Sequence, residues 1–213
     1  MEKQPTKARQ TFLAIGAIIA WFAVVVQFYL LIVNRVTSIP ETIIRFFSFY
    51  TILTNILVAL CFTFLLLKPK SGWVRFFSKP ATITAIAVYI TVVGIVYNII
   101  LRFIWNPQGL QIVVDELLHL IIPALFILYW LIFAPKSGLG WKNVFPWLIF
   151  PLVYILVILI RGALSAFYPY PFIDVKTLGY YKVFLNSGGL FIGFLLLSSL
   201  FVAIGKIMSL ERF

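Results

Sequence analysis

The stretch RFFSFYTILTNILVAL, from Arg45 to Leu60, decides the fold of this 213-residue chain. Most of its side chains are apolar, and the apolar run continues to Leu67, which is long enough for a helix that crosses a bilayer. The whole chain is 63% hydrophobic and has a mean hydropathy of +1.09. A soluble domain cannot bury that share of apolar side chains, so lipid must surround most of the protein.

Six segments of the chain have the length and apolar character of a membrane-spanning helix. Their apolar runs are continuous rather than alternating, which excludes a transmembrane β-barrel. The sequence therefore predicts an all-α fold in which residues 1–213 form a single membrane domain, a six-transmembrane-helix integral membrane bundle. The predicted spans are roughly 11–34, 43–67, 81–104, 112–134, 144–166 and 180–205.

The first span and the lone cysteine exclude several other classes of protein. The first apolar segment runs for about 23 residues, longer than the roughly 7–15 of a signal-peptide core, so we interpret it as a retained span. Cys61 is the only cysteine and His119 the only histidine. No cofactor or metal site is therefore expected, because a second histidine or a cysteine pair would be needed to complete one.

The net charge of +11 is distributed as a topology signal rather than as a nucleic-acid interface. If the N-terminus lies inside, eleven basic residues fall on the inner side and six on the outer side. This asymmetry predicts that both termini are cytoplasmic, and no nucleic-acid partner is expected. The inner residues are Lys3, Lys7, Arg9, Lys68, Lys70, Arg75, Lys79, Lys136, Lys142, Lys206 and Arg212. The outer residues are Arg35, Arg45, Arg102, Arg161, Lys176 and Lys182.

Polar side chains gather near the outer end of the predicted second span. Ser48, Thr51 and Asn55 follow an i, i+3, i+7 spacing, which places them on one face of a continuous helix. Small hydroxyl residues are common at helix–helix contacts in membranes, so packing is one interpretation of this face. The other is that these side chains line a reactive pocket.

The predicted fourth span carries the second half of such a pocket. Asp115 and His119 are four residues apart and share a helix face, and so do Asn98 and Arg102 on the third span. At a rise of ~1.5 Å per residue, Ser48 and His119 both lie on the order of 8–10 Å below the outer edge. A hydroxyl, a histidine and a carboxylate are the parts of an activated nucleophile. A structural or proton-handling role for the histidine is the alternative.

The outer segment from Tyr168 to Asp174 contains two prolines, Pro169 and Pro171, which disfavour a helix and favour extended backbone. Irregular backbone at membrane depth has to be buried in protein or line a wet cavity. We therefore expect this segment to fold over the outer opening of the pocket as a lid or rim.

Three short motifs occur in an order that resembles the androgen-induced-gene family of six-span membrane hydrolases, and above all its bacterial branch. They are RFFSF at 45–49, LHLIIP at 118–123 and YPFID at 170–174. The resemblance implies an intramembrane threonine and histidine that cleave fatty acid esters of hydroxy fatty acids. The histidine would be His119, the threonine position is occupied by Ser48, and Thr51, one turn deeper, is the alternative nucleophile.

This resemblance completes a set of expected site residues. Asp115 would support the histidine, and Asn55 would donate to the developing oxyanion. Arg102 or Arg161 would hold a substrate carboxylate, or else reach toward the membrane surface. Asn98 and Tyr170 are further candidates for substrate binding.

The expected function is an intramembrane hydrolase of lipid esters, acting on a membrane lipid in a bacterial cytoplasmic membrane. The alternative is a small lipid-binding or transport protein that uses the same outer-leaflet pocket without catalysis. A third class, a structural or partner-binding membrane protein, would have no use for the clustered polar residues. The sequence leaves the oligomeric state open.

Overall fold

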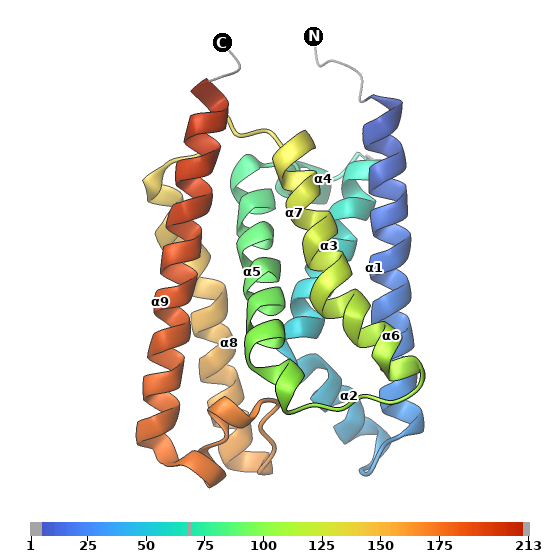
Figure 1. Cartoon of the computed structure of the whole chain (residues 1–213), viewed down its shortest axis with the longest axis vertical. Coiled ribbons are helices and arrows are strands. Elements are labelled where there is room, and N and C mark those ends of the chain that lie inside the picture. The colour runs from blue at the N-terminus through green and yellow to red at the C-terminus, as the bar shows by residue number, and fades with distance from the viewer. Residues whose placement is uncertain (1–5, 68–69, 211–213) are drawn as a thin grey trace.

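The computed structural model of the chain describes residues 6–67 and 70–210, which form a helical bundle without strands (Figure 1). Six helices in this part of the chain are long and apolar enough to cross a membrane. This confirms the predicted all-α class and the six helices, and it indicates an integral membrane protein. The helices that carry the spans are α1 (Lys7–Val33), α3 (Tyr50–Leu67), α5 (Pro80–Ile99), α6 with α7 (Leu110–Glu116 and Ile122–Phe133), α8 (Val144–Ser165) and α9 (Val175–Leu210).

The predicted second span is wrong in one respect, because it is not a single helix. The backbone turns extended at Phe49 (φ −82°, ψ 123°), which separates the short helix α2 (Ile39–Ser48) from α3. Helix α2 lies at the end of the bundle opposite the start of α1 (Figure 1). Ser48 therefore does not share a continuous helix face with Thr51 and Asn55, as the i, i+3, i+7 spacing had suggested.

The fourth span is also interrupted, but without a break in the helix. A π-helical turn, η2 (Leu117–Ile121), joins α6 to α7 and contains His119. Pro123, the second residue of α7, has no N–H for the carbonyl four residues earlier, which is that of His119. π turns inside α-helices are frequent at functional sites.

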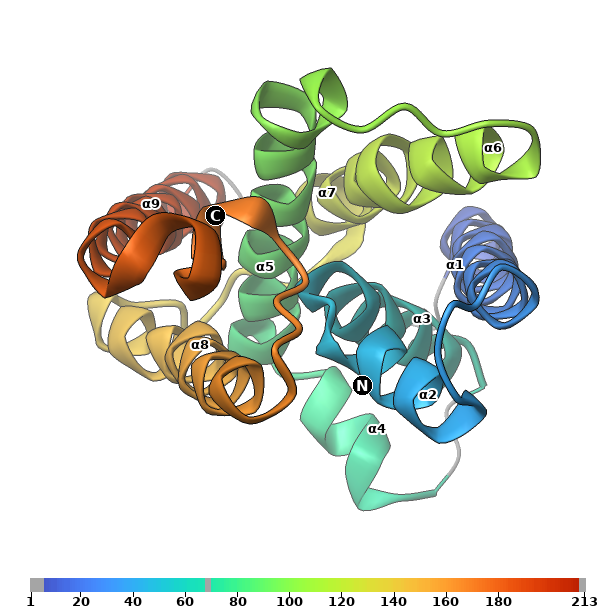
Figure 2. The ribbon, with the colours of Figure 1, turned by 90° about the horizontal axis from the view of Figure 1, so that it is seen from below.

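Helix α5 lies at the centre of the bundle, between α3, α7 and the α8–α9 pair (Figure 2). It approaches the interrupted span closely at Gly94. A Cβ atom at that position would lie 3.4 Å from the carbonyl oxygen of His119 and 3.4 Å from the Cβ atom of Pro123. The glycine therefore allows α5 to pack directly on the π turn.

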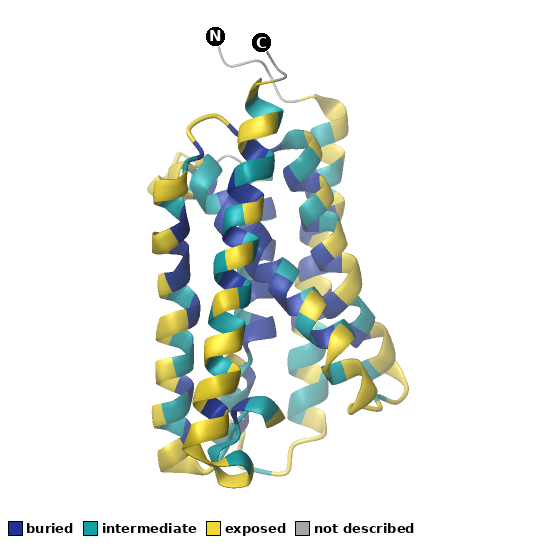
Figure 3. Cartoon of the chain, turned by 60° about the vertical axis from the view of Figure 1, so that its left-hand side comes forward, coloured by how far each residue is buried: buried dark blue, intermediate teal, exposed yellow. Residues whose placement is uncertain are grey.

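The remaining elements are short and lie at the two ends of the bundle. Helix α4 (Gly72–Phe77) precedes α5, and a 3-10 turn, η1 (Leu101–Phe103), follows α5. The turn η3 (Trp141–Asn143) precedes α8. Figure 3 shows that the buried residues face inward, while the outer helix faces are largely exposed. Those outer faces carry large apolar side chains, including Ile18, Phe145 and Leu164, which suits contact with lipid.

The segment between α8 and α9 folds back onto the bundle. The ring of Tyr168 in this segment lies so close to Gly162 of α8 that a Cβ atom on this glycine would collide with the ring. A 3-10 turn, η4 (Pro171–Ile173), follows, and Tyr170 forms hydrogen bonds with Thr51 of α3. The expected contact between this segment and the second span is therefore present.

Candidate functional site

A cavity of about 830 Å³ lies at the end of the bundle where α2 is found. Its volume is within the range of small-molecule sites. The wall comes from α1, α2, α3, α5, η1 and the loop after it, α6, the π turn and the segment between α8 and α9. Four of the predicted site residues line it, namely Thr51, Asp115, His119 and Tyr170.

The imidazole of His119 is held in one orientation by two contacts. Its Nδ1 lies 2.9 Å from the backbone oxygen of Asp115, and a carbonyl can only accept, so Nδ1 carries the hydrogen. The ring stacks on Tyr97 with centroids 3.8 Å apart and an interplanar angle of 11°. In the neutral imidazole Nε2 then holds the lone pair, and no described side chain or backbone group forms a hydrogen bond to it. His119 is thus prepared to accept a proton at Nε2.

Two asparagines stabilise the backbone of this π turn. The Nδ2 atom of Asn98 donates to the carbonyl of His119 at 3.2 Å, and that of Asn55 donates to the carbonyl of Leu118 at 3.2 Å. Pro123 supplies no N–H to His119 in an α-helical pattern or to Leu118 in a π-helical pattern. Pro123 therefore leaves one of these two carbonyls without its helical donor, and the asparagines donate to both, since a buried carbonyl without a donor is costly.

The expected substrate-binding roles of these two asparagines are therefore not supported. Neither residue lines the cavity. Asn55 also donates to the carbonyl of Thr51 at 2.9 Å, so its amide hydrogens point at backbone rather than at a substrate. The oxygen of Asn98 accepts from Nε of Arg102 at 2.9 Å. Both side chains position the histidine turn.

Thr51 lies at the beginning of α3, where the first backbone N–H groups of a helix have no partner within the helix. Its N–H donates to the hydroxyl of Tyr170 at 3.2 Å, and its Oγ1 lies 3.3 Å from the same hydroxyl. Thr51 and Tyr170 also line a second, apolar cavity of about 90 Å³ beside α5, α8 and α9. Thr51 is thus placed where the two cavities meet. Within the described residues, no hydrogen bond joins it to His119.

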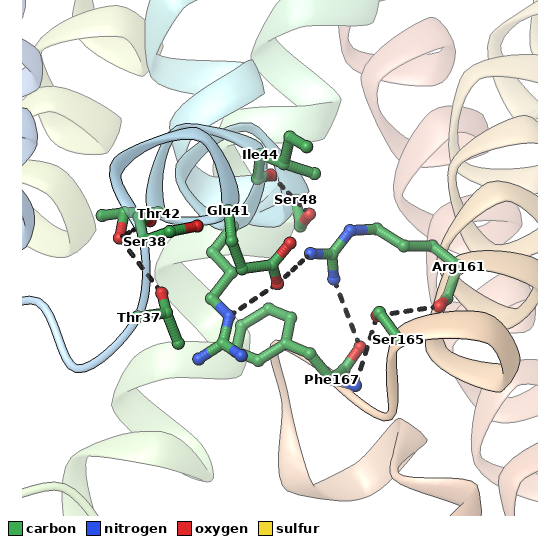
Figure 4. Close-up of polar contacts among 10 residues, drawn as sticks. Thr37, Ser38, Glu41, Thr42, Ile44, Ser48, Arg161, Ser165 and Phe167 are labelled. Carbon is green, nitrogen blue, oxygen red and sulfur yellow. Dashed lines mark hydrogen bonds and ion pairs between the residues drawn. The ribbon is translucent and has the colours of Figure 1, made fainter.

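Ser48 is placed differently from the expectation. Its hydroxyl donates to the carbonyl of Ile44 at 2.7 Å, as Figure 4 shows, and it lines neither cavity. Its own carbonyl accepts from the hydroxyl of Tyr154 at 2.9 Å. The predicted pair of Ser48 and His119 facing one cavity is not present, because the break at Phe49 turns this serine away.

The carboxylate of Asp115 also differs from its predicted role. It accepts from Nε1 of Trp105 at 2.6 Å and from Nε2 of Gln111 at 3.0 Å, whereas His119 meets only the backbone carbonyl of Asp115. Gln111 reaches on to Oε1 of Gln27 at 2.7 Å. The side chain of Asp115 belongs to the cavity wall, and the expected acid–base–hydroxyl relay is not formed.

The two arginines proposed to hold a carboxylate are both engaged outside the cavity. Arg102 pairs with Glu116 at 2.7 Å. Arg161 pairs with Glu41 at 2.7 Å, and Arg45 binds the same carboxylate at 2.8 Å (Figure 4). The hydrogen bond from Arg45, followed by that from Arg161, lowers the pKa of Glu41 below its ordinary value. Neither Arg102 nor Arg161 lines the cavity, so the predicted carboxylate clamp is not in place.

Tyr97, Trp105 and Gln111 contribute to the site but were not among the predicted residues. Gln111 lies four residues before Asp115, a spacing that indicates contact on one helix face. Tyr97 and Trp105 act across helices or from a loop, so no local pattern identifies them. Within residues 6–67 and 70–210, no three metal-binding side chains of the His, Cys, Asp or Glu type come together.

Comparison with family models, curated proteins and solved structures found no match for this chain. The resemblance to the androgen-induced-gene family therefore stays a hypothesis.

Proposed function

We propose that the chain is an intramembrane hydrolase of lipid esters, in which Thr51 is the nucleophile and His119 the general base. One observation carries the proposal: a threonine hydroxyl and a histidine with an available Nε2 line the same cavity within the apolar bundle. This pair of residue types is also what the resemblance to the androgen-induced-gene hydrolases implies. The structure favours Thr51 over Ser48 because only Thr51 faces the cavity.

The reaction would proceed in two steps through an acyl-enzyme. Nε2 of His119 accepts the hydroxyl proton of Thr51 while Oγ1 bonds to the ester carbonyl carbon. The bond to the alcohol then breaks, and His119 returns the proton to the leaving oxygen. In the second step His119 takes a proton from water, the hydroxide attacks the acyl carbon, and the fatty acid leaves as Thr51 regains its proton. Thr51 has to exchange its contact with Tyr170 for one with His119.

The beginning of α3 and Tyr170 would stabilise the charge that develops on the carbonyl oxygen. The positive end of the helix dipole lies at Thr51, whose backbone N–H points at the Tyr170 hydroxyl. That hydroxyl accepts the N–H and still has its own hydrogen to donate. Donors fixed in a site with little water are effective stabilisers of an oxyanion. In this proposal Tyr170 takes the role that was expected of Asn55.

We further propose that both termini are cytoplasmic and that the protein lies in a bacterial cytoplasmic membrane. The start of α1, the end of α9 and helix α4 lie at the same end of the bundle (Figure 1), which suits the grouping of basic residues in these segments. Lys3, Lys68 and Arg212 of that group lie outside the described residues. The cavity would then open in the outer half of the bilayer, where a lipid reaches it sideways. A reporter fused after Phe213 should be active only on the cytoplasmic side, and activity on the outer side would overturn the orientation.

Lipid binding or transport without cleavage is the second candidate, and one observation favours it. The hydroxyl of Thr51 contacts Tyr170 and not His119, so nucleophile and base are not paired in this structure. A lipid that fills both cavities would need no reaction to bind. Release of fatty acid distinguishes the two candidates.

The test is the release of fatty acid from a palmitoyl ester by purified protein in vesicles. The wild type should release palmitate. Thr51→Ala should be inactive and His119→Ala at least about 10²-fold slower, while both variants remain folded. Ser48→Ala is the matched hydroxyl variant and should keep its activity. If no palmitoyl ester is cleaved by the wild type and His119→Ala instead changes lipid binding, the hydrolase proposal fails and the binding function replaces it.

A further inference from the structure

The wall of the large cavity contains an acidic side chain but no basic one. Asp115 is its only acidic residue, and none of the residues that line it within the described chain is a lysine or an arginine. The other polar side chains of the wall are neutral amides and hydroxyls together with His119. A ligand in this cavity therefore meets a negative charge that no cation of the wall balances.

Three arginines at this end of the bundle, Arg45, Arg102 and Arg161, already have anionic partners. Arg102 pairs with Glu116 at 2.7 Å, so the two contribute no net charge to the site. Arg45 and Arg161 share Glu41 and lie over the ring of Phe167, 4.4 and 5.0 Å from its centroid. None of these arginines lines the cavity. A substrate carboxylate would find no free guanidinium there and would lie in the same cavity as Asp115.

Aromatic rings line the same cavity as this carboxylate. Tyr97, Trp105, Phe49 and Tyr170 all line the cavity, and the Nε1–H of Trp105 donates to Asp115 at 2.6 Å. That bond fixes the indole next to the negative charge. Aromatic rings with a nearby carboxylate are the usual means by which proteins recognise quaternary ammonium groups. Such a group has no N–H, so it needs the charge and the ring faces rather than an unused oxygen lone pair. Both oxygens of Asp115 already accept a hydrogen bond.

We propose that the lipid ester taken by this site carries a quaternary ammonium headgroup, which binds against Asp115 and the ring of Trp105. This inference rests on the proposed hydrolase function and names its substrate class. The headgroup then lies in the larger cavity, and the carbons next to the ester enter the apolar cavity that begins at Thr51 and Tyr170. At about 90 Å³ this cavity holds only a few carbons, so the rest of the acyl chain extends out of it. The ester would sit at the junction, where Thr51 is. A choline ester and a phosphocholine lipid share this headgroup chemistry.

The first measurement compares cleavage of palmitoyl esters by the wild type in neutral vesicles. The esters are palmitoylcholine, methyl palmitate and the palmitic ester of hydroxystearic acid, and palmitoyl lysophosphatidylcholine is the phospholipid arm. We expect kcat/KM for palmitoylcholine to exceed that for methyl palmitate at least about tenfold, with the anionic ester slowest, because its charge is repelled. An equal preference for the lysophospholipid would identify a phospholipid as the source of the headgroup. Equal rates for the cationic, neutral and anionic esters, or a preference for the anionic one, would overturn the proposal.

Two neighbouring variants locate the origin of the preference. Asp115→Asn keeps an oxygen for Trp105 but removes the charge, and it should abolish the preference for palmitoylcholine. Glu116→Gln combined with Arg102→Gln removes an ion pair that lies outside the cavity without changing the net charge, and this variant should keep the preference. A preference that survives Asp115→Asn contradicts the proposed site. If that variant does not fold, the wild-type ranking of the esters decides alone.

A binding measurement separates this proposal from the hydrolase function. Hexadecyltrimethylammonium should bind the wild type at least about tenfold more tightly than hexadecanol, and palmitate most weakly. If no ester is cleaved but this order holds and depends on Asp115, the headgroup site stands and the hydrolase function fails. If esters are cleaved without any headgroup ranking, the hydrolase function stands and the headgroup site fails.

Discussion

Two membrane-spanning segments of this protein contain an internal proline. In both, a side chain of another helix donates a hydrogen bond to the carbonyl four residues before the proline. Pro151 lies inside α8 and has no N–H for the carbonyl of Trp147, which instead accepts from the hydroxyl of Tyr89 at 2.7 Å. Pro123 likewise has none for the carbonyl of His119, which accepts from Asn98 at 3.2 Å. Both donors come from α5, the central helix.

The difference between the two prolines lies in the turn that precedes them. Helix α8 remains α-helical through Pro151, whereas the backbone before Pro123 passes through a π turn. At the π turn a second carbonyl, that of Leu118, also accepts a hydrogen bond from a side chain, Asn55. The π turn also places His119 in the wall of the large cavity. In α8 the hydrogen bond from a side chain to the backbone carbonyl is structural. In the fourth span such a bond also positions the imidazole of His119.

The largest expected effect comes from the group that only the Pro123 region carries. His119→Ala should lower the rate of ester cleavage about 10²- to 10⁴-fold, because the general base is lost. Tyr89→Phe, which alters the Pro151 region, should leave cleavage unchanged. Fatty acid release from vesicles measures both. Comparable losses in the two variants would contradict the functional difference between the regions.

The next effect separates positioning from stability. Asn98→Ala and Tyr89→Phe each remove one donor from a buried carbonyl, so each should cost about 0.5–2 kcal/mol of unfolding free energy. Thermal unfolding in detergent would show this as a Tm lower by several degrees.

Only Asn98→Ala should also lower kcat, about tenfold by comparison with other misplaced catalytic groups, while KM stays near that of the wild type. Asn98→Gln retains an amide donor and should recover part of the rate. A variant of Asn98 with normal kcat would show that the carbonyl bond does not position His119.

The smallest effect concerns the ion pairs of α2, which involve no proline. The lowered pKa of Glu41 means that its pairs with Arg45 and Arg161 stabilise the fold at pH values above the ordinary value of 4.5. This contribution is lost as the pH falls through the lowered pKa. Glu41→Gln should therefore lower Tm by about 1–3 °C at neutral pH, and the difference from the wild type should vanish in strong acid. A difference that grows toward low pH would contradict the assigned sign.

Much of the fold follows from local sequence, because a run of about 20 apolar residues is sufficient to define a span in lipid. The i, i+4 spacing of Asp115 and His119 likewise brought two cavity residues together correctly. The break at Phe49 was not predictable, since no proline or glycine marks it. It depends on Tyr154 and Tyr170, which bond to Ser48 and Thr51 from more than 100 residues away.

Tertiary contacts also decided the roles of the remaining predicted residues. Pro123 identifies the carbonyl of His119 as one that needs a donor, but only the packing of α5 shows that Asn98 provides it. Arg161 finds its partner Glu41 120 residues away, so its ion pair has no local signature.

The most direct test of the proposed chemistry is to locate a fluorophosphonate adduct on the purified protein by mass spectrometry. Because Thr51 and His119 line one cavity, the adduct should be found on Thr51 and should be absent from His119→Ala. An adduct on Ser48, or labelling of Thr51 that persists without the imidazole, would contradict the assignment of His119 as the base for Thr51.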